Sequence, residues 1–335
     1  HQHLVTYGVA FGVTGNYAPD DYANCLPKCD PDDETCADPI CPPSAPSDTV
    51  ASTSPWPAPT NQPRKIDDLY HASVNGRGKF FTADNPEKLV GSLEAVAQSI
   101  KNTTATGSSV SVNTQQLRND TSLYQATYLP RNWTGDVVAK PIDPDTGLIV
   151  QDTLPDGSLT DRVDWSAADQ IDALTWTSRK IITYNPETGA GVSFANDNLS
   201  SEQQGQLAAT EASRISLINF LRGDKSQEGV LFRARDSLMG DVVHASPIPY
   251  RWDIDADGVV FVGANDGMLH VLREDTGDEL FSYIPNLVFA NLKHLADDPY
   301  AHKYYVDNDP YITKLGTTGT TLLIGGLGRG GRGYY

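Results

Sequence analysis

The chain has 335 residues, a formal net charge of −18 at pH 7 and 39% hydrophobic residues. This length is enough for two or three domains with a sizeable core. The acidic balance argues against a nucleic-acid partner, because an acidic surface repels polyphosphate and attracts cations such as calcium. No apolar run approaches the roughly 20 residues that a membrane span requires, so we expect no membrane span in this segment.

The first predicted elements are typical of an α/β domain. Residues 4–11 alternate large apolar and small residues, as in a strand that is covered on both faces. Because the chain opens on this strand and not on a signal sequence, we expect it to be an internal piece of a longer protein. A helix is predicted after Asn85, which suits an N-cap, with Pro86 at the first helical position. Its apolar residues recur every three or four positions: Leu89, Leu93, Val96 and Ile100.

An insert rich in Pro, Asp, Ser and Thr, at about residues 16–63, separates this strand from the helix. It holds all four cysteines of the chain: Cys25, Cys29, Cys36 and Cys41. Four cysteines in a short segment without a core favour two disulfides in an oxidising compartment, which would add about 3 kcal/mol of stability. The spacing leaves all three pairings open. A metal knuckle is the alternative, although the spacing lacks the paired C-x2-C of common zinc sites.

The middle of the chain is predicted to be a connecting region. Residues 103–121 are rich in Ser, Thr and Asn and indicate a linker. Strands are expected at residues 123–128, 136–139, 148–152 and 180–184, and helices at residues 201–209 and 213–221. Three tryptophans are expected to pack under sheet edges, with carbohydrate stacking as the alternative: Trp133, Trp165 and Trp176.

Residues 242–289 contain the densest run of strand and turn signals and predict a β-meander. Strands are expected at residues 259–262, 268–272 and 279–284, joined by an Asn-Asp-Gly turn and an Asp-Thr-Gly-Asp turn. Residues 321–326 begin a second copy of the pattern. One such sheet cannot bury both of its faces, so we expect similar sheets to pack beside it, as propeller blades do.

A candidate calcium loop precedes the first strand of the meander. Its carboxylates occupy the first, third and fifth loop positions, followed by glycine at the sixth: Asp253, Asp255 and Asp257. The ninth and twelfth positions hold Phe261 and Ala264, which cannot serve as the usual ligands. Affinity should therefore be weak, about 10⁻⁴ to 10⁻³ M, unless Asp266 or another loop contributes. A solvated turn explains the loop equally well.

Other motifs favour structural roles. Arg222-Gly223-Asp224 spells an integrin-recognition tripeptide, but the glycine suits the C-terminal cap of the predicted helix. Residues 326–331 fit G-x-G-x-x-G, yet no helix is predicted after them, so we reject a dinucleotide site. No nucleophile and base stand in a catalytic order. Four histidines are expected to be packed or hydrogen-bonded scaffold residues: His244, His270, His294 and His302.

Several motifs together resemble one known family. They are Phe-Val-Gly-Ala-Asn-Asp-Gly-Met-Leu-His at residues 261–270, Leu-Ile-Gly-Gly-Leu-Gly at residues 323–328, Gly-Arg-Gly-Tyr-Tyr at residues 331–335 and Gly-Asp-Val-Val-His-Ala-Ser-Pro at residues 240–247. They are similar to the opening of the propeller in the PilC/PilY family, whose members are type IV pilus tip adhesins and assembly factors. The meander alone would fit any quinoprotein-like propeller.

The resemblance implies a mixed, multi-domain fold. Residues 1–105 would be the end of an α/β von Willebrand A-like domain that carries the Cys-rich insert. Residues 106–240 would connect it to a mainly antiparallel β region, and residues 241–335 would form the first blades of a quinoprotein-like β-propeller. The calcium loop that the family leads us to expect has an acid at the ninth position and would lie beyond Tyr335.

The resemblance also implies a non-enzymatic protein at the cell surface. It would sit at the pilus tip, outer-membrane associated or secreted, and contact minor pilins there. It would promote pilus assembly and extension and attach to a host-cell or abiotic surface ligand. Calcium is a candidate modulator. Two rivals remain open. One is a quinoprotein dehydrogenase, because quinone-binding propellers use a similar glycine-aspartate-glycine repeat, and the other is a structural module without a ligand.

Overall fold

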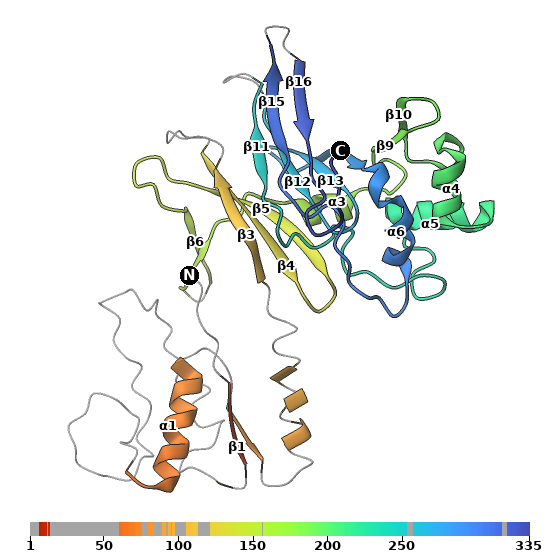
Figure 1. Cartoon of the computed structure of the whole chain (residues 1–335). Coiled ribbons are helices and arrows are strands. Elements are labelled where there is room, and N and C mark those ends of the chain that lie inside the picture. Colours follow the sequence, from red (N-terminus) through yellow and green to blue (C-terminus); the bar gives the residue numbers. More distant parts are fainter. Residues whose placement is uncertain are drawn as a thin grey trace. The chain divides into compact units, whose positions relative to one another are not determined.

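The computed structural model contains two compact units, which are shown in Figure 1. One consists of His1–Asn102 and Leu154–Ser158, and the other of Thr103–Thr153 and Leu159–Tyr335. The structure describes residues 7–11, 13, 60–75, 80–83, 89–91, 93–94, 96–97, 105–112, 121–155, 157–252, 257–316 and 320–335. Among these residues, no helix has the length and apolar character to span a membrane.

The first unit has an α/β arrangement in its described part. Strand β1 (Gly8–Phe11) pairs in parallel with β2 (Phe80–Ala83), and helix α1 (Gln62–Asn75) lies between them in the chain. Tyr70 of α1 stacks on Phe80, with 5.1 Å between ring centroids. The predicted first strand is confirmed at β1, whereas α1 was not anticipated. Residues 89–91, 93–94 and 96–97 are helical, in the place of the helix predicted after Asn85.

A four-stranded antiparallel sheet opens the second unit. Its order is β3 (Ala105–Val112), β4 (Ser122–Leu129), β5 (Thr134–Pro141) and β8 (Trp165–Ser166). The linker predicted at residues 103–121 is therefore wrong over β3. This segment alternates small polar residues with valine, and it forms an edge strand because β4 pairs with it. Strand pairing here outweighs the low strand propensity of the small polar residues.

A six-stranded sheet follows in the order β10-β9-β14-β13-β12-β11. Its last four strands are β11 (Ile248–Tyr250), β12 (Val259–Gly263), β13 (Leu269–Arg273) and β14 (Glu279–Ile284). The predicted meander and both of its turns are confirmed. Strand β9 (Ile181–Asn185) adds to β14 in parallel, and β10 (Ala190–Ser193) forms the outer edge. A separate hairpin is formed by β6 (Gln151–Thr153) and β7 (Leu159–Asp161).

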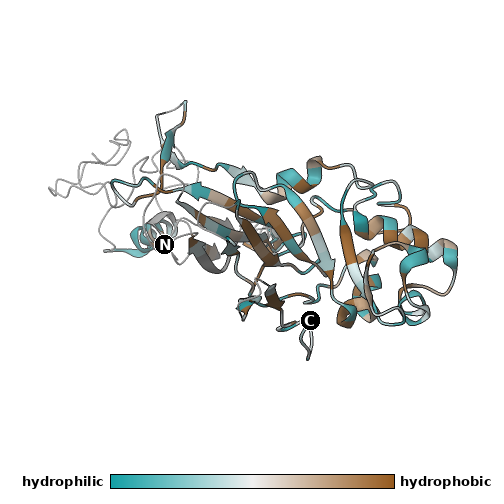
Figure 2. Ribbon diagram, turned by 90° about the horizontal axis from the view of Figure 1, so that it is seen from above, coloured by the Kyte–Doolittle hydropathy of each residue, from teal (hydrophilic) through white to brown (hydrophobic). Residues whose placement is uncertain are grey.

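Both faces of the meander are buried, and strand β12 shows this most clearly. Val260 and Val262 belong to a cluster with Tyr124, Val137 and Trp165 of the four-stranded sheet. The alternate residues of β12, Val259 and Phe261, belong to a second cluster on the other face. Figure 2 shows hydrophobic residues along these central strands. Different structural elements therefore cover the two faces, and the covers are not two similar blades.

The second cluster draws on short helices and on the end of the chain. Helices α4 (Ser201–Leu207), α5 (Glu211–Arg222) and α6 (Phe289–Leu292) contribute Leu207, Phe220 and Phe289 to it. Helix α3 (Ala167–Ala173) belongs to the cluster on the opposite face. The predicted helices at residues 201–209 and 213–221 are confirmed by α4 and α5. Three single 3-10 turns complete the helical elements in the described chain: Asn196–Asn198, Asn286–Val288 and Lys293–Ala296.

The second copy of the meander pattern begins as a hairpin. Strand β15 (Tyr311–Leu315) pairs with β16 (Thr320–Ile324), as β11 pairs with β12. The last residues then fold back, because Gly325 and Tyr335 exchange backbone hydrogen bonds of 2.9 and 2.8 Å. Residues 330–335, which the sequence pattern places at the turn and return strand of this second copy, thus pair back onto Gly325 and Gly326.

We predict that Gly263→Ala destabilises the second unit. A Cβ atom at this position would lie 2.5 Å from the backbone oxygen of Val306, so the two segments would have to separate, at a cost of about 1–3 kcal/mol. Urea unfolding of the full chain measures the effect. Gly191→Ala in β10 is the matched control, because a Cβ atom there meets nothing within 4 Å. Equal unfolding midpoints for the two variants would contradict the close approach at Val306.

Candidate functional site

The loop of the predicted calcium site joins β11 to β12. Asp253 and Asp255 lie outside the described residues, and Asp257 is exposed. The loop therefore stays a prediction. At its base, Glu274 donates its backbone N–H to Gly258 O at 3.0 Å, and a Cβ on Gly258 would overlap the Glu274 carboxylate. Gly258 is thus required by this close approach, whether or not a cation binds.

Two further carboxylates near the meander are already committed to protein partners. Glu274, which the sequence did not single out, accepts hydrogen bonds from Arg251 Nε at 2.6 Å and from the Tyr124 hydroxyl at 3.3 Å. Asp266, considered above as an additional ligand, lies in the turn at the opposite end of β12 and is paired there. The suggestion that Asp266 completes the calcium loop is therefore wrong. In the part of the chain that the structure describes, no three His, Cys, Asp or Glu side chains are arranged to hold a metal ion.

Buried charges lie in a row across the meander. Arg179 donates two hydrogen bonds of 2.7 Å to Glu279, and both side chains are 1% exposed. Glu279 Oε1 also lies 3.0 Å from Nδ1 of the fully buried His270. The other ring nitrogen of His270 is 3.0 Å from Asp266 Oδ2, which accepts from Gly240 N–H as well. The four side chains form an alternating array of cations and anions, here called the buried charge row.

The pKa values follow from this alternation. Burial disfavours the charged imidazole of His270, but Asp266 and Glu279 outweigh burial and raise its pKa to about 9. Burial likewise opposes ionisation of Glu279, yet hydrogen bonds from Arg179 and His270 lower the pKa of this carboxyl far below its ordinary value. Each charge in the row is therefore held by its neighbours. Arg179, Glu279 and His270 are sealed from solvent and stabilise the sheet, whereas the Asp266 side chain is 14% exposed and lines a small pocket.

Hydrogen bonds between the two repeats form a second constellation. Asp307 accepts from His244 N–H at 3.2 Å and lies 2.6 Å from His244 Nδ1, while Asp309 accepts from Ser246 N–H. Each of these pairs is separated by 63 residues, which is the period of the repeat. Hydrogen bonds thus join equivalent positions in the segment that leads into β11 and the segment that leads into β15.

A third histidine crosses between the same segments. His302 Nε2 lies 2.9 Å from Asp241 Oδ2, and Asn265 Nδ2 donates to that same oxygen at 2.7 Å. Burial raises the pKa of Asp241, although its hydrogen bond with His302 works in the opposite direction. Trp133 covers His302, with 3.7 Å between ring centroids. Its φ of 54° is rare for an aromatic residue, so the surroundings hold this tryptophan in place.

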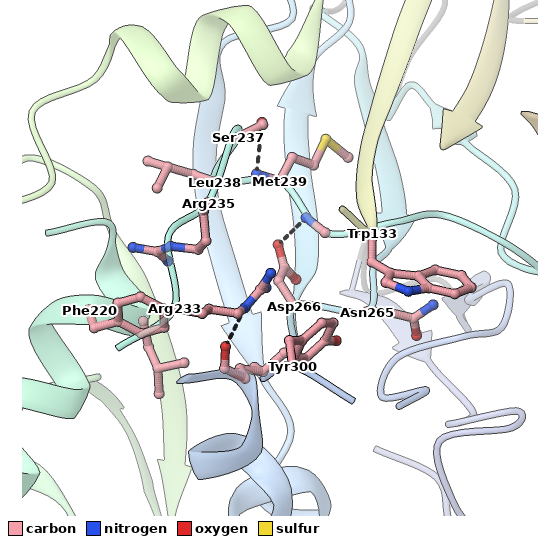
Figure 3. A pocket seen from close by; sticks show the side chains of 13 residues that line it. Trp133, Phe220, Arg233, Arg235, Ser237, Leu238, Met239, Asn265, Asp266 and Tyr300 are labelled. Atoms are coloured by element: carbon pink, nitrogen blue, oxygen red, sulfur yellow. Dashed lines mark hydrogen bonds between the residues drawn. The ribbon is translucent and has the colours of Figure 1, made fainter. Parts of the chain in front are cut away.

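A small pocket adjoins the buried charge row. It has room for about 20 Å³, and Figure 3 shows Arg233 and Asp266 near its centre, with Trp133 on one side and Phe220 on the other. Tyr300 forms part of its wall, and the guanidinium carbon of Arg233 lies 3.9 Å from the centroid of that ring. The pocket combines aromatic walls with a central cation.

Most motifs chosen from sequence have the structural role expected of them. Gly223 caps α5 with a φ of 118°, and Arg222 donates to the backbone oxygens of Phe194 and Arg179, which confirms the helix-cap interpretation of the tripeptide. Gly326 of the dinucleotide-like motif forms an antiparallel bridge with Tyr334, and the rejection of a dinucleotide site stays a prediction. All four chosen histidines are hydrogen-bonded to carboxylates. Cys25, Cys29, Cys36 and Cys41 lie outside the described residues, and their disulfides stay a prediction.

Sequence reasoning missed the residues that join distant segments. Trp165 is buried as expected, and its indole donates to Glu274 O at 3.0 Å. Arg179 and Arg233 drew no attention, because an isolated arginine in a loop carries no spacing signal. Asp307 and Asp309 could have been found by aligning the segments before β11 and β15, since the lead-in segments of two blades are expected to touch.

Comparisons with known proteins also indicate a propeller in the part of the chain that contains the repeat. A family model described as the PilY1 beta-propeller domain matches residues 253–335. Over its whole length, the chain is 29% identical to the type IV pilus biogenesis factor PilY1 of Pseudomonas aeruginosa PAO1, of which it spans 30%. Over 78% of its length, it is 32% identical to a PilY1 homolog of Xylella fastidiosa Temecula1, of which it spans 22%. The chain thus spans less than a third of these relatives. No solved structure matches it.

We predict that the buried charge row makes stability fall as the pH rises from 6.5 towards 9. In this range the native state keeps the proton of His270, whose pKa is about 9, whereas the unfolded state loses it near 6.5. The native state then binds more protons, so stability falls by up to about 1.4 kcal/mol per pH unit. Urea unfolding at several pH values measures this slope.

His270→Gln should remove this component of the slope, although the variant will be less stable at every pH. His294→Gln is the matched control, because His294 pairs with Asp297 on the surface and its loss should leave the slope unchanged. A wild-type stability that stays flat over this range, or an equal fall in His270→Gln, would show that His270 is not the titrating group.

Proposed function

Because this chain is a segment of a PilC/PilY-family protein, we propose that it contributes the opening of a propeller to a factor in type IV pilus biogenesis. The observation that carries the proposal is the agreement between two independent features. The PilY1 propeller model matches residues 253–335, and hydrogen bonds at a spacing of 63 residues join Asp307 and Asp309 of this region to His244 and Ser246, which precede it. Similarity to PilY1 over the entire chain supports the same role.

We further propose a location at the cell surface and at the pilus tip, where this protein contacts minor pilins, promotes extension and attaches to surfaces or host cells. The protein acts by binding and not by catalysis. The internal pairing of the charged residues supports a structural task, since the row formed by Arg179, Glu279, His270 and Asp266 is enclosed in the core.

The first unit is proposed to be the end of a von Willebrand A-like domain. The parallel pair of β1 and β2, with α1 between them in the chain, supports this assignment. A parallel pair requires a crossover connection, and a helix is its usual form. The Cys-rich insert would then be a loop of that domain.

Deletion of the encoding gene is predicted to reduce the number of surface pili and twitching motility. Electron microscopy counts the pili, and spreading beneath agar measures the motility. The wild-type gene should restore both, whereas a variant with Asp307→Ala and Asp309→Ala should restore them poorly, because it loses the hydrogen bonds between repeats. Asp197→Ala, at an exposed position in a 3-10 turn, is the control and should restore them fully. Normal piliation in the deletion strain would rule out the proposed role.

Calcium binding at Asp253, Asp255 and Asp257 is the remaining proposal for this segment. Calorimetric titration of the chain should show weak binding, with Kd about 10⁻⁴ to 10⁻³ M, that is lost in a variant with Asp253→Ala and Asp255→Ala. The variant with Asp143→Ala and Asp145→Ala, in the loop that follows β5, is the control and should leave the binding unchanged. Binding that survives in the first variant would place the cation elsewhere and reduce residues 253–258 to a turn.

A further inference from the structure

Arg233 is held in the pocket in a fixed orientation. Its Nε donates to the backbone oxygen of Leu295 at 2.7 Å, and its guanidinium lies flat over the ring of Tyr300. Its own backbone N–H donates to Ala296 O at 3.1 Å. The side chain is therefore anchored on one edge, and the outer edge with its two Nη groups points away from these contacts.

The Nη groups of Arg233 differ from those of the neighbouring arginines. Arg179 donates to the Glu279 carboxylate and to Arg222 O, Arg222 donates to Phe194 O and Arg179 O, and Arg235 pairs with Glu228. Arg233 has no ion pair and no acceptor for either Nη among the described residues. Burial lowers the pKa of Arg233, which shows that its charge is partly removed from water. The Nη groups are not among the buried side-chain atoms that lack a partner, so an anion from solution can reach them.

The acids around the pocket have hydrogen-bond partners of their own, although Glu228 and Asp241 also act on Arg233 and raise its pKa. Asp266 pairs with His270, Glu228 with Arg235, and Asp241 with His302. Ser237, which also lines the pocket, accepts from Met239 N–H through its hydroxyl oxygen and keeps its O–H as a donor. The pocket therefore offers an unpaired cation and a hydroxyl donor, although the whole chain carries a charge of −18.

We propose that this pocket binds a carboxylate group through the Nη edge of Arg233. A guanidinium edge with two free N–H groups matches the two oxygens of a carboxylate, and such bidentate pairs are shorter and stronger than single hydrogen bonds. Trp133 and Tyr300 form aromatic walls beside the guanidinium.

The carboxylate can belong to a free small acid or to an acidic side chain of a protein, and the test separates these sources. The indole N–H resonance of Trp133, assigned with Trp133→Phe, reports on occupancy of the pocket in nitrogen-labelled protein. Sodium acetate and the amide of N-acetylglutamate are titrated at constant ionic strength, with sodium chloride and the N-acetylglutamine amide as their controls. We expect saturable shifts with both carboxylates and none with the controls. Tighter binding of the glutamate derivative identifies a protein side chain, and tighter binding of acetate identifies a small acid.

Variants of Arg233 decide whether the effect belongs to this side chain. Arg233→Gln should abolish the shift, and Arg233→Lys, which keeps a charge but lacks the planar fork, should weaken binding by about tenfold. Arg214→Gln is the matched control, because Arg214 makes its own contacts to Asn196 and Ala208 and should leave the shift unchanged. Thermal unfolding checks that each variant is folded. If Arg233→Gln does not fold, the result for Arg233→Lys decides the test. No saturable shift in the wild type, an equal response to chloride, or a full response in a folded Arg233 variant would overturn the proposal.

Discussion

The buried charge row constrains the second unit more than any other set of contacts, because a charge inside a core is tolerated only beside its partner. It consists of Arg179, Glu279, His270 and Asp266. The four residues come from the segment just before β9, from β14, from β13 and from the turn after β12. Their pairing therefore requires β9 to lie next to β14. This requirement explains why strands from the predicted connecting region and from the predicted propeller share one sheet.

The contacts between repeats build outward from that sheet. Asp241 holds His302 and Asn265 together, and Asp307 binds His244 of the preceding repeat. These hydrogen bonds place the Trp133 ring over His302 and bring Tyr300 under Arg233. The pocket proposed to bind a carboxylate lies where the region before the meander meets the turn after β12 and the segment that contains Tyr300.

The meander was predictable from the chain because its signals are local. Strong turn residues at Asn265–Gly267 and Asp275–Asp278 separate β-branched and aromatic runs, and these determine strands and register together. Gly223 likewise marked the end of α5. Strand β3 was missed because its Ser and Thr residues become a strand only beside β4. Helix α1 was missed because residues 62–75 are mostly polar, and the helix is recognised by its packing against β1 and β2.

The sequence by itself determined the order of the strands in each hairpin, the cap at Gly223 and the repeat that resembles a PilC/PilY propeller, since each depends on residues close together in the chain. The tertiary structure alone decided which carboxylate each histidine meets, which elements cover the two faces of β12, and that Arg233 is left with unused donors. Several of these contacts join residues separated by 60 residues or more, such as Asp241 with His302 and Arg233 with Leu295. No local pattern encodes such a distance, because only the packed chain brings these charges together.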